Sequence, residues 1–81
     1  MRHLIVAHTY VQAQEWAYSE QLLPAEWRFI RNGNDIRGYA AACEVQVDVL
    51  PGWSLGSDRD YQQKSHALNL ARAMGHRIVE A

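Results

Sequence analysis

The chain has 81 residues, 48% of them hydrophobic, and its eight basic and nine acidic residues give a formal net charge of −1. A chain of this length holds one hydrophobic core, so we expect a single α/β domain over residues 1–81. The balanced charge offers no general attraction to phosphate backbones or anionic lipid, which argues against nucleic acid and membranes as partners.

Cysteine content and hydropathy predict the cellular compartment of the protein. The single Cys43 has no partner for an internal disulfide or a cysteine zinc site, which favours a reducing environment. The N-terminal run MRHLIVAH is too short for the apolar part of a signal peptide, and no stretch has the length of a membrane span. We therefore expect a soluble, cytoplasmic protein.

The first 24 residues predict a strand and a helix. Residues 3–7 form an apolar run without alternation, as in a central parallel strand covered on both faces. Residues 10–22 have the three-to-four spacing of an amphipathic helix, with alanines that allow close approach to a sheet. Pro24 ends this helix.

The middle of the chain predicts two more strands. In residues 26–31 Trp27 and Phe29 alternate with Arg28 and Ile30, as in a strand with one wetter face, and we expect it at the sheet edge. Turn-forming residues follow, and residues 35–43 predict a short helical turn. Residues 44–50 place three valines on one face and Gln46 and Asp48 on the other, which predicts a strand with one apolar side.

The C-terminal third predicts the longest helix and a last strand. Ser57 is a good N-cap for a helix over residues 58–74, and Gly75 stops it. The apolar stripe of this helix consists of Tyr61, Leu68, Ala71 and Met74. Residues 77–81 close the chain as a short strand.

This order predicts a small three-layer α/β fold of Rossmann-like or flavodoxin-like topology, with two main helices on a parallel sheet. Right-handed crossovers give the spatial strand order 2-1-3-4. Ligands bind such sheets beyond the strand carboxyl ends where the winding reverses, here between the first and third strands. The ligand-binding residues expected there are His8, Thr9, Tyr10, Trp53, Ser54, Gly56 and Ser57.

The first of these loops has two interpretations. It lacks the glycines of a dinucleotide fingerprint, so we expect no such cofactor. Thr9 and Gln12 fit a capping box, which explains Thr9 without a ligand, although a helix N-terminus can receive an anion. His8 either donates to a ligand or is a half-buried ring bonded to a backbone carbonyl.

In the second loop the large aromatic side chain of Trp53 is expected to pack against another group. That group is the core, a subunit interface or a stacked base or ring. Asp58 and Asp60 suit the positive end of the helix dipole. The sequence DVLPGWSLGS, followed by ALNLARAMG and RIV, resembles the C-terminal half of nucleoside 2-deoxyribosyltransferase-like domains, many of them small and phage-encoded. The similarity covers Val47 to Val79 and implies the same architecture, a nucleoside-sized crevice and, for a phage protein, the host cytoplasm.

The resemblance does not extend to the catalytic residue. Enzymes of that family use a glutamate nucleophile on the helix after this loop, where the present chain has Gln62 and Gln63. A neutral amide cannot form the covalent glycosyl intermediate. Asp58 and Asp60 are the nearby carboxylates that would have to replace it, so a divergent transferase is an alternative.

Other motifs give little support to catalysis. The four histidines have no metal spacing, and no G-x-S-x-G, P-loop or C-x-x-C motif occurs, so we expect no metal and no cofactor. Arg28, Arg31 and Arg37 could bind phosphate, but a solvated strand edge is our default interpretation.

We therefore expect a non-catalytic accessory protein that binds a nucleotide-like small molecule. The alternative from a different class is a protein-interaction module. In that case Trp27, Phe29 and Trp53 cover the surface of a homodimer or of a host protein.

Overall fold

The computed structural model describes residues 1–39 and 44–81 of the chain. The strands in these residues are β1 (Arg2–Val6), β2 (Trp27–Phe29), β3 (Val45–Val49) and β4 (Arg77–Glu80). The helices are α1 (Tyr10–Ser19), the short α2 (Asn34–Arg37) and α3 (Asp58–Ala73), with a 3-10 turn, η1, over Pro24–Glu26. Cys43 and the end of the helical turn expected over residues 35–43 lie outside the described residues.

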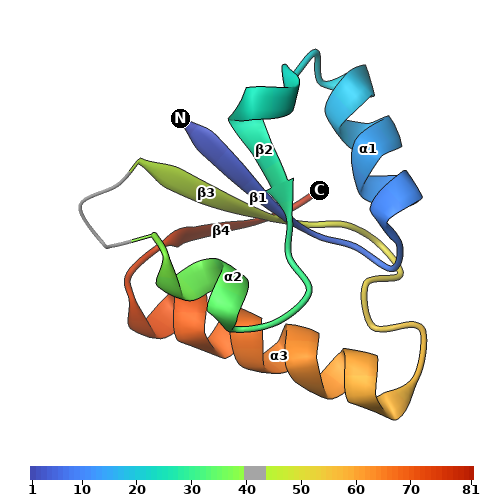
Figure 1. The fold of residues 1–81 in the computed structure, drawn as a ribbon, viewed down its shortest axis with the longest axis vertical. Helices are drawn as coiled ribbons and strands as arrows, with labels where there is room; N and C mark the ends of the chain where they lie inside the picture. The colour runs from blue at the N-terminus through green and yellow to red at the C-terminus, as the bar shows by residue number, and fades with distance from the viewer. Residues whose placement is uncertain (40–43) are drawn as a thin grey trace.

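The strands form one parallel sheet in the order β2-β1-β3-β4, with α1 on one side and α2 and α3 on the other (Figure 1). This confirms the predicted α/β fold of Rossmann-like topology. β1 and β3 pair from Arg2 beside Val45 to Val6 beside Val49, and β2 lies at the sheet edge, as its pattern predicted.

The larger part of the core lies between the sheet and α3. Val47 of β3 and Leu4 of β1 are fully buried there against Ala67 and Ala71 of α3. The valines of β3 thus face α3, as the alternation predicted. Each such Val or Leu contributes roughly 1.5–3 kcal/mol of transfer free energy when buried.

The second part of the core lies under α1. Ala13 and Ala17 are buried against Ile5 of β1, because their small side chains let the helix approach the sheet. Trp27 and Phe29 of β2 pack against the same cluster. Both rings are therefore half-buried within their own chain.

The ends of α3 agree closely with the sequence signals. The Ser57 side chain accepts a hydrogen bond from the Asp60 N–H at 3.2 Å, and Gly75 follows the helix with φ of +80°. The prediction that Tyr61 belongs to the buried stripe of this helix is wrong, because Tyr61 is 46% exposed. No helix in the two described ranges is long and apolar enough to cross a bilayer.

α1 and β2 are shorter than predicted. α1 ends at Ser19 and not at residue 22, because Gln21 takes a left-handed conformation (φ +59°) and the Leu22 N–H donates back to Ala17 O at 2.9 Å. β2 ends at Phe29, although the Ile30 N–H still donates to the Ile5 carbonyl oxygen of β1 at 2.9 Å. The next N–H, of Arg31, donates to the Asp35 side chain at 2.8 Å and not to β1.

Candidate functional site

The predicted site requires that the loops after β1 and β3 meet at one edge of the sheet. The two strands are parallel neighbours, and the Leu50 N–H donates to the Val6 carbonyl oxygen at 2.9 Å. The chain therefore leaves both strands at the same edge, beyond the carboxyl ends where open α/β sheets bind ligands.

The side chain of Gln12 connects these two loops by hydrogen bonds. Its Oε1 accepts the His8 N–H at 2.9 Å, and its Nε2 donates to the Pro51 carbonyl oxygen at 2.8 Å. The Gln12 N–H donates to Thr9 Oγ1 at 3.1 Å, so Thr9 caps α1 as the capping box predicts. The reciprocal bond goes to His8 and not to Thr9. The two cavities near this edge are each lined by residues of one of the two loops and not by both.

A cavity of about 460 Å³ opens on the β2 side of the first loop. We call it the Lys64 cavity. Its lining residues are His8, Thr9, Tyr10, Phe29, Arg31, Asn32, Asp60, Gln63 and Lys64. Three of the seven residues expected to bind a ligand thus share one cavity, between the ends of β1 and β2 and the first half of α3.

The four other expected residues lie outside this lining. Trp53 and Ser54 line a separate cavity of about 300 Å³ near Glu80, and Trp53 stacks on Tyr61 with ring centroids 5.6 Å apart. Gly56, with φ of +111°, lies beside His8, and Ser57 caps α3. The structure therefore does not bring Trp53 together with His8, Thr9 and Tyr10.

Lys64 is the most unusual residue of the cavity. Its side chain belongs to the buried face of α3, and the residue is only 5% exposed. Nζ donates to the His8 carbonyl oxygen at 3.1 Å and lies 5.9 Å from the centre of the Phe29 ring. Burial lowers the pKa of Lys64, and the nearby Asp60 carboxylate partly opposes this effect. An ammonium group has three donors, so Lys64 retains donors for a ligand.

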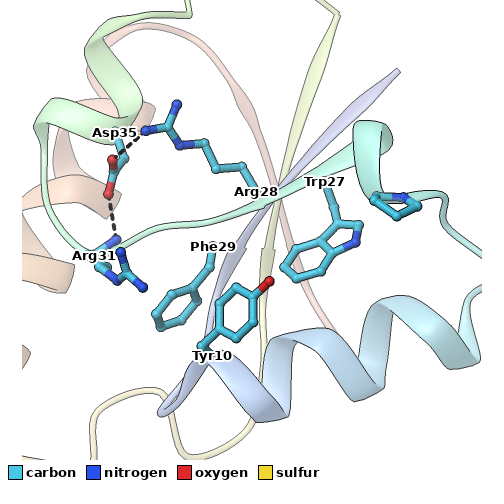
Figure 2. A pocket seen from close by; sticks show the side chains of 7 residues that line it. Tyr10, Trp27, Arg28, Phe29, Arg31 and Asp35 are labelled. Atoms are coloured by element: carbon cyan, nitrogen blue, oxygen red, sulfur yellow. Dashed lines mark hydrogen bonds and ion pairs between the residues drawn. The ribbon is translucent and has the colours of Figure 1, made fainter.

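Aromatic rings form the wall between this cavity and a second hollow along β2. Figure 2 shows Tyr10, from the start of α1, beside Trp27 and Phe29 of β2. The Tyr10 ring centroid lies 5.7 Å from that of Trp27 and 5.9 Å from that of Phe29. Tyr10 is 46% exposed, so part of its ring is accessible to a flat partner.

The arginines beside the rings differ in their partners. Arg28 pairs with Asp35 at 3.0 Å in the second hollow, which measures about 280 Å³. The guanidinium of Arg31 lies 5.5 Å from the centre of the Phe29 ring and forms no ion pair with any residue in the described ranges. The Lys64 cavity thus contains two cations, Arg31 and Lys64, against one carboxylate, Asp60. Its charge favours an anion.

Sequence reasoning missed Lys64, although a signal was present. The predicted stripe passes from Tyr61 to Leu68, and helical spacing places residue 64 between them on the same face. Lys64 is also the chain's only lysine. Arg31 was interpreted as part of a solvated edge, and its position in the cavity follows from the turn held by Asp35.

Only two of the four residues that the resemblance singled out line the Lys64 cavity. Gln63 and Asp60 line the cavity, whereas Gln62 and Asp58 are exposed elsewhere. No group of three His, Cys, Asp or Glu side chains in residues 1–39 and 44–81 is arranged to hold a metal ion.

Comparisons with protein-family models, curated proteins and solved structures found no match for this chain. The similarity to nucleoside 2-deoxyribosyltransferase-like domains, and the phage origin and cytoplasmic location expected with it, therefore stay predictions.

Proposed function

We propose that the protein binds a nucleotide-like small molecule in the Lys64 cavity without transforming it. The observation that carries the proposal is the buried ammonium of Lys64 at a cavity with an exposed aromatic ring. A buried cation is costly unless it is paired and hydrogen-bonded. An anionic group of a ligand would supply the missing charge.

The chemistry of the wall supports a ligand with both a ring and an anion. Tyr10 offers a face for a planar base, and stacking of one base on an aromatic side chain contributes about 1–3 kcal/mol. Arg31 and Lys64 together supply donors for a phosphate. The volume of about 460 Å³ lies within the range of roughly 300–1,000 Å³ typical of small-molecule sites.

A thermal-shift screen tests this proposal. The probes are purine and pyrimidine nucleosides and their 5′-monophosphates. A ligand at a hundred times its dissociation constant adds about 2.7 kcal/mol to the free energy of unfolding. We expect monophosphates to raise the melting temperature of the wild-type protein and of Arg72→Met, an exposed cation on the same helix, but not of Lys64→Met. Absence of a shift with every monophosphate would contradict the proposal.

A divergent transferase is the second candidate, because Asp60 lines the cavity and could act as a nucleophile. Asp58 does not line it. The interaction module expected from Trp27, Phe29 and Trp53 receives less support. These rings are half-buried against their own chain.

A further inference from the structure

On the side of the sheet that faces α1, the helix packs over β1, and a cavity lies beside it over β3 and β4. Val79 of β4 and Asp48 of β3 are neighbours in the register and line a cavity of about 390 Å³ beside Trp16 and Leu22. Parallel strands normally have both faces covered. We call the surface formed by Gln46, Arg77 and Val79, with the buried Asp48 between them, the open face.

A buried carboxylate lies at the centre of the open face. Asp48 is 1% exposed, and its Oδ2 is 2.7 Å from His3 Nδ1 while Oδ1 accepts from Gln46 Nε2 at 2.7 Å. Glu20 adds a second carboxylate at the rim of the same cavity. Two carboxylates, Asp48 and Glu20, therefore line this cavity.

A cation lies on the same face. Arg77 is the register partner of Gln46, and its neighbour Ile78 packs into the core on the α3 side. Because side chains alternate along a strand, Arg77 projects on the side of the open face. Arg77 is exposed and forms no ion pair with a residue in the described part of the chain.

These charges make the open face complementary to itself. A two-fold axis brings the same patch of two copies into contact. A residue of the first copy that contacts a second residue of its partner is therefore matched by the same contact in the opposite direction. Glu20 at the rim of the cavity and Arg77 beside it carry opposite charges, which such an axis can bring together. We infer that two copies of this chain associate through the open face, and that Arg77 of the partner subunit enters the acidic cavity near Glu20.

The association would also cover apolar side chains around the cavity of the open face. Trp16, Leu22 and Val79 surround the cavity, and each is half-buried in one copy alone. A second copy would remove the remaining apolar area from water. Lys64 lies at another part of the molecule, so the association and ligand binding are separate properties.

Sedimentation equilibrium with charge-exchange variants tests the inference. We expect the wild-type protein to be a dimer at tens of micromolar. Arg77→Glu and Glu20→Arg should each raise the dimer dissociation constant at least tenfold. The double variant, which exchanges the two charges, should restore association. Arg72→Glu, on the exposed side of α3, is the matched control and should remain dimeric.

Circular dichroism shows whether each variant is folded. If a charge reversal unfolds the chain, Arg77→Ala and Glu20→Ala replace it, and both are expected to weaken the dimer. A wild-type protein that is monomeric over this range overturns the inference. So does a dimer that persists in Arg77→Glu, or one that the double variant fails to restore.

Discussion

The Lys64 ammonium donates to the carbonyl oxygen of His8 at 3.1 Å, across 56 positions of the chain. This bond connects the buried face of α3 to the loop between β1 and α1. It places the only lysine of the chain at a cavity where Tyr10 and Arg31 also lie. A charged group in that position has consequences for stability and for binding that separate experiments can measure.

The stability of the protein should depend on pH through Lys64. Burial lowers its pKa below the usual value of 10.5, so the folded protein holds this proton less tightly than the unfolded chain. Between the lowered pKa and 10.5 the unfolded chain binds more protons. The free energy of unfolding contributed by this site therefore increases as pH rises through that window.

Urea unfolding at pH 7 and pH 10 measures this contribution by difference. Wild type should gain stability relative to Lys64→Met at the higher pH, since other titrating groups are common to both proteins. Arg72→Met should show no such difference from wild type. A wild-type gain that is absent, or that has the opposite sign, would mean that Lys64 is not desolvated.

Gln12 should stabilise the fold through its bridge between His8 and Pro51. Gln12→Ala removes both side-chain hydrogen bonds, each with a net contribution of about 0.5–1.5 kcal/mol, so we expect a loss of about 1–3 kcal/mol. Gln14→Ala, an exposed position on the same helix, is the control and should change stability little. Equal effects of the two substitutions in chemical denaturation would argue against the bridge.

Tyr10 should matter more for binding than for stability. Its ring is 46% exposed, so Tyr10→Ala should cost only about 1 kcal/mol of folding free energy. Loss of a stacking surface should reduce the affinity for a nucleoside monophosphate about tenfold. Calorimetric titration measures the affinity. Tyr18→Ala, at a side chain that is 85% exposed, should leave it unchanged.

Asp60 distinguishes the two candidate functions. If the protein only binds its ligand, Asp60→Asn should retain binding, because the carboxylate opposes the anion that the cavity attracts. Incubation of the wild-type protein with a deoxynucleoside should release no free base by chromatography. Base release that Asp60→Asn abolishes and Asp58→Asn does not would establish the transferase instead.

Much of the fold could be predicted because its signals are local. The alternating valines of β3 determine which face meets α3, and Ser57 and Gly75 mark the ends of that helix. The end of α1 could not be predicted so well, since the left-handed conformation of Gln21 has no glycine to signal it. Local spacing therefore predicts elements better than their ends.

The side chains of the sites depend on contacts between distant residues. Alternation placed Asp48 on the face away from the valines, but its hydrogen-bond partner His3 lies 45 positions earlier in the chain. The sequence predicted that the loops after β1 and β3 would meet, and they do. It did not predict that Gln12 would connect them by hydrogen bonds, or that the cavity beside the first loop would lie on the β2 side.

The central claim is that Lys64 receives the anionic group of a nucleotide-like ligand. Calorimetric titration of a nucleoside and its 5′-monophosphate into wild type and Lys64→Met measures this contact directly. A hydrogen bond to a charged group contributes about 1.5–3 kcal/mol, so wild type should bind the monophosphate roughly 10- to 100-fold more tightly than the nucleoside. In Lys64→Met this preference should be clearly smaller, and Arg31 accounts for what is left of it. An equal preference in both proteins, or no binding to either, would contradict the claim.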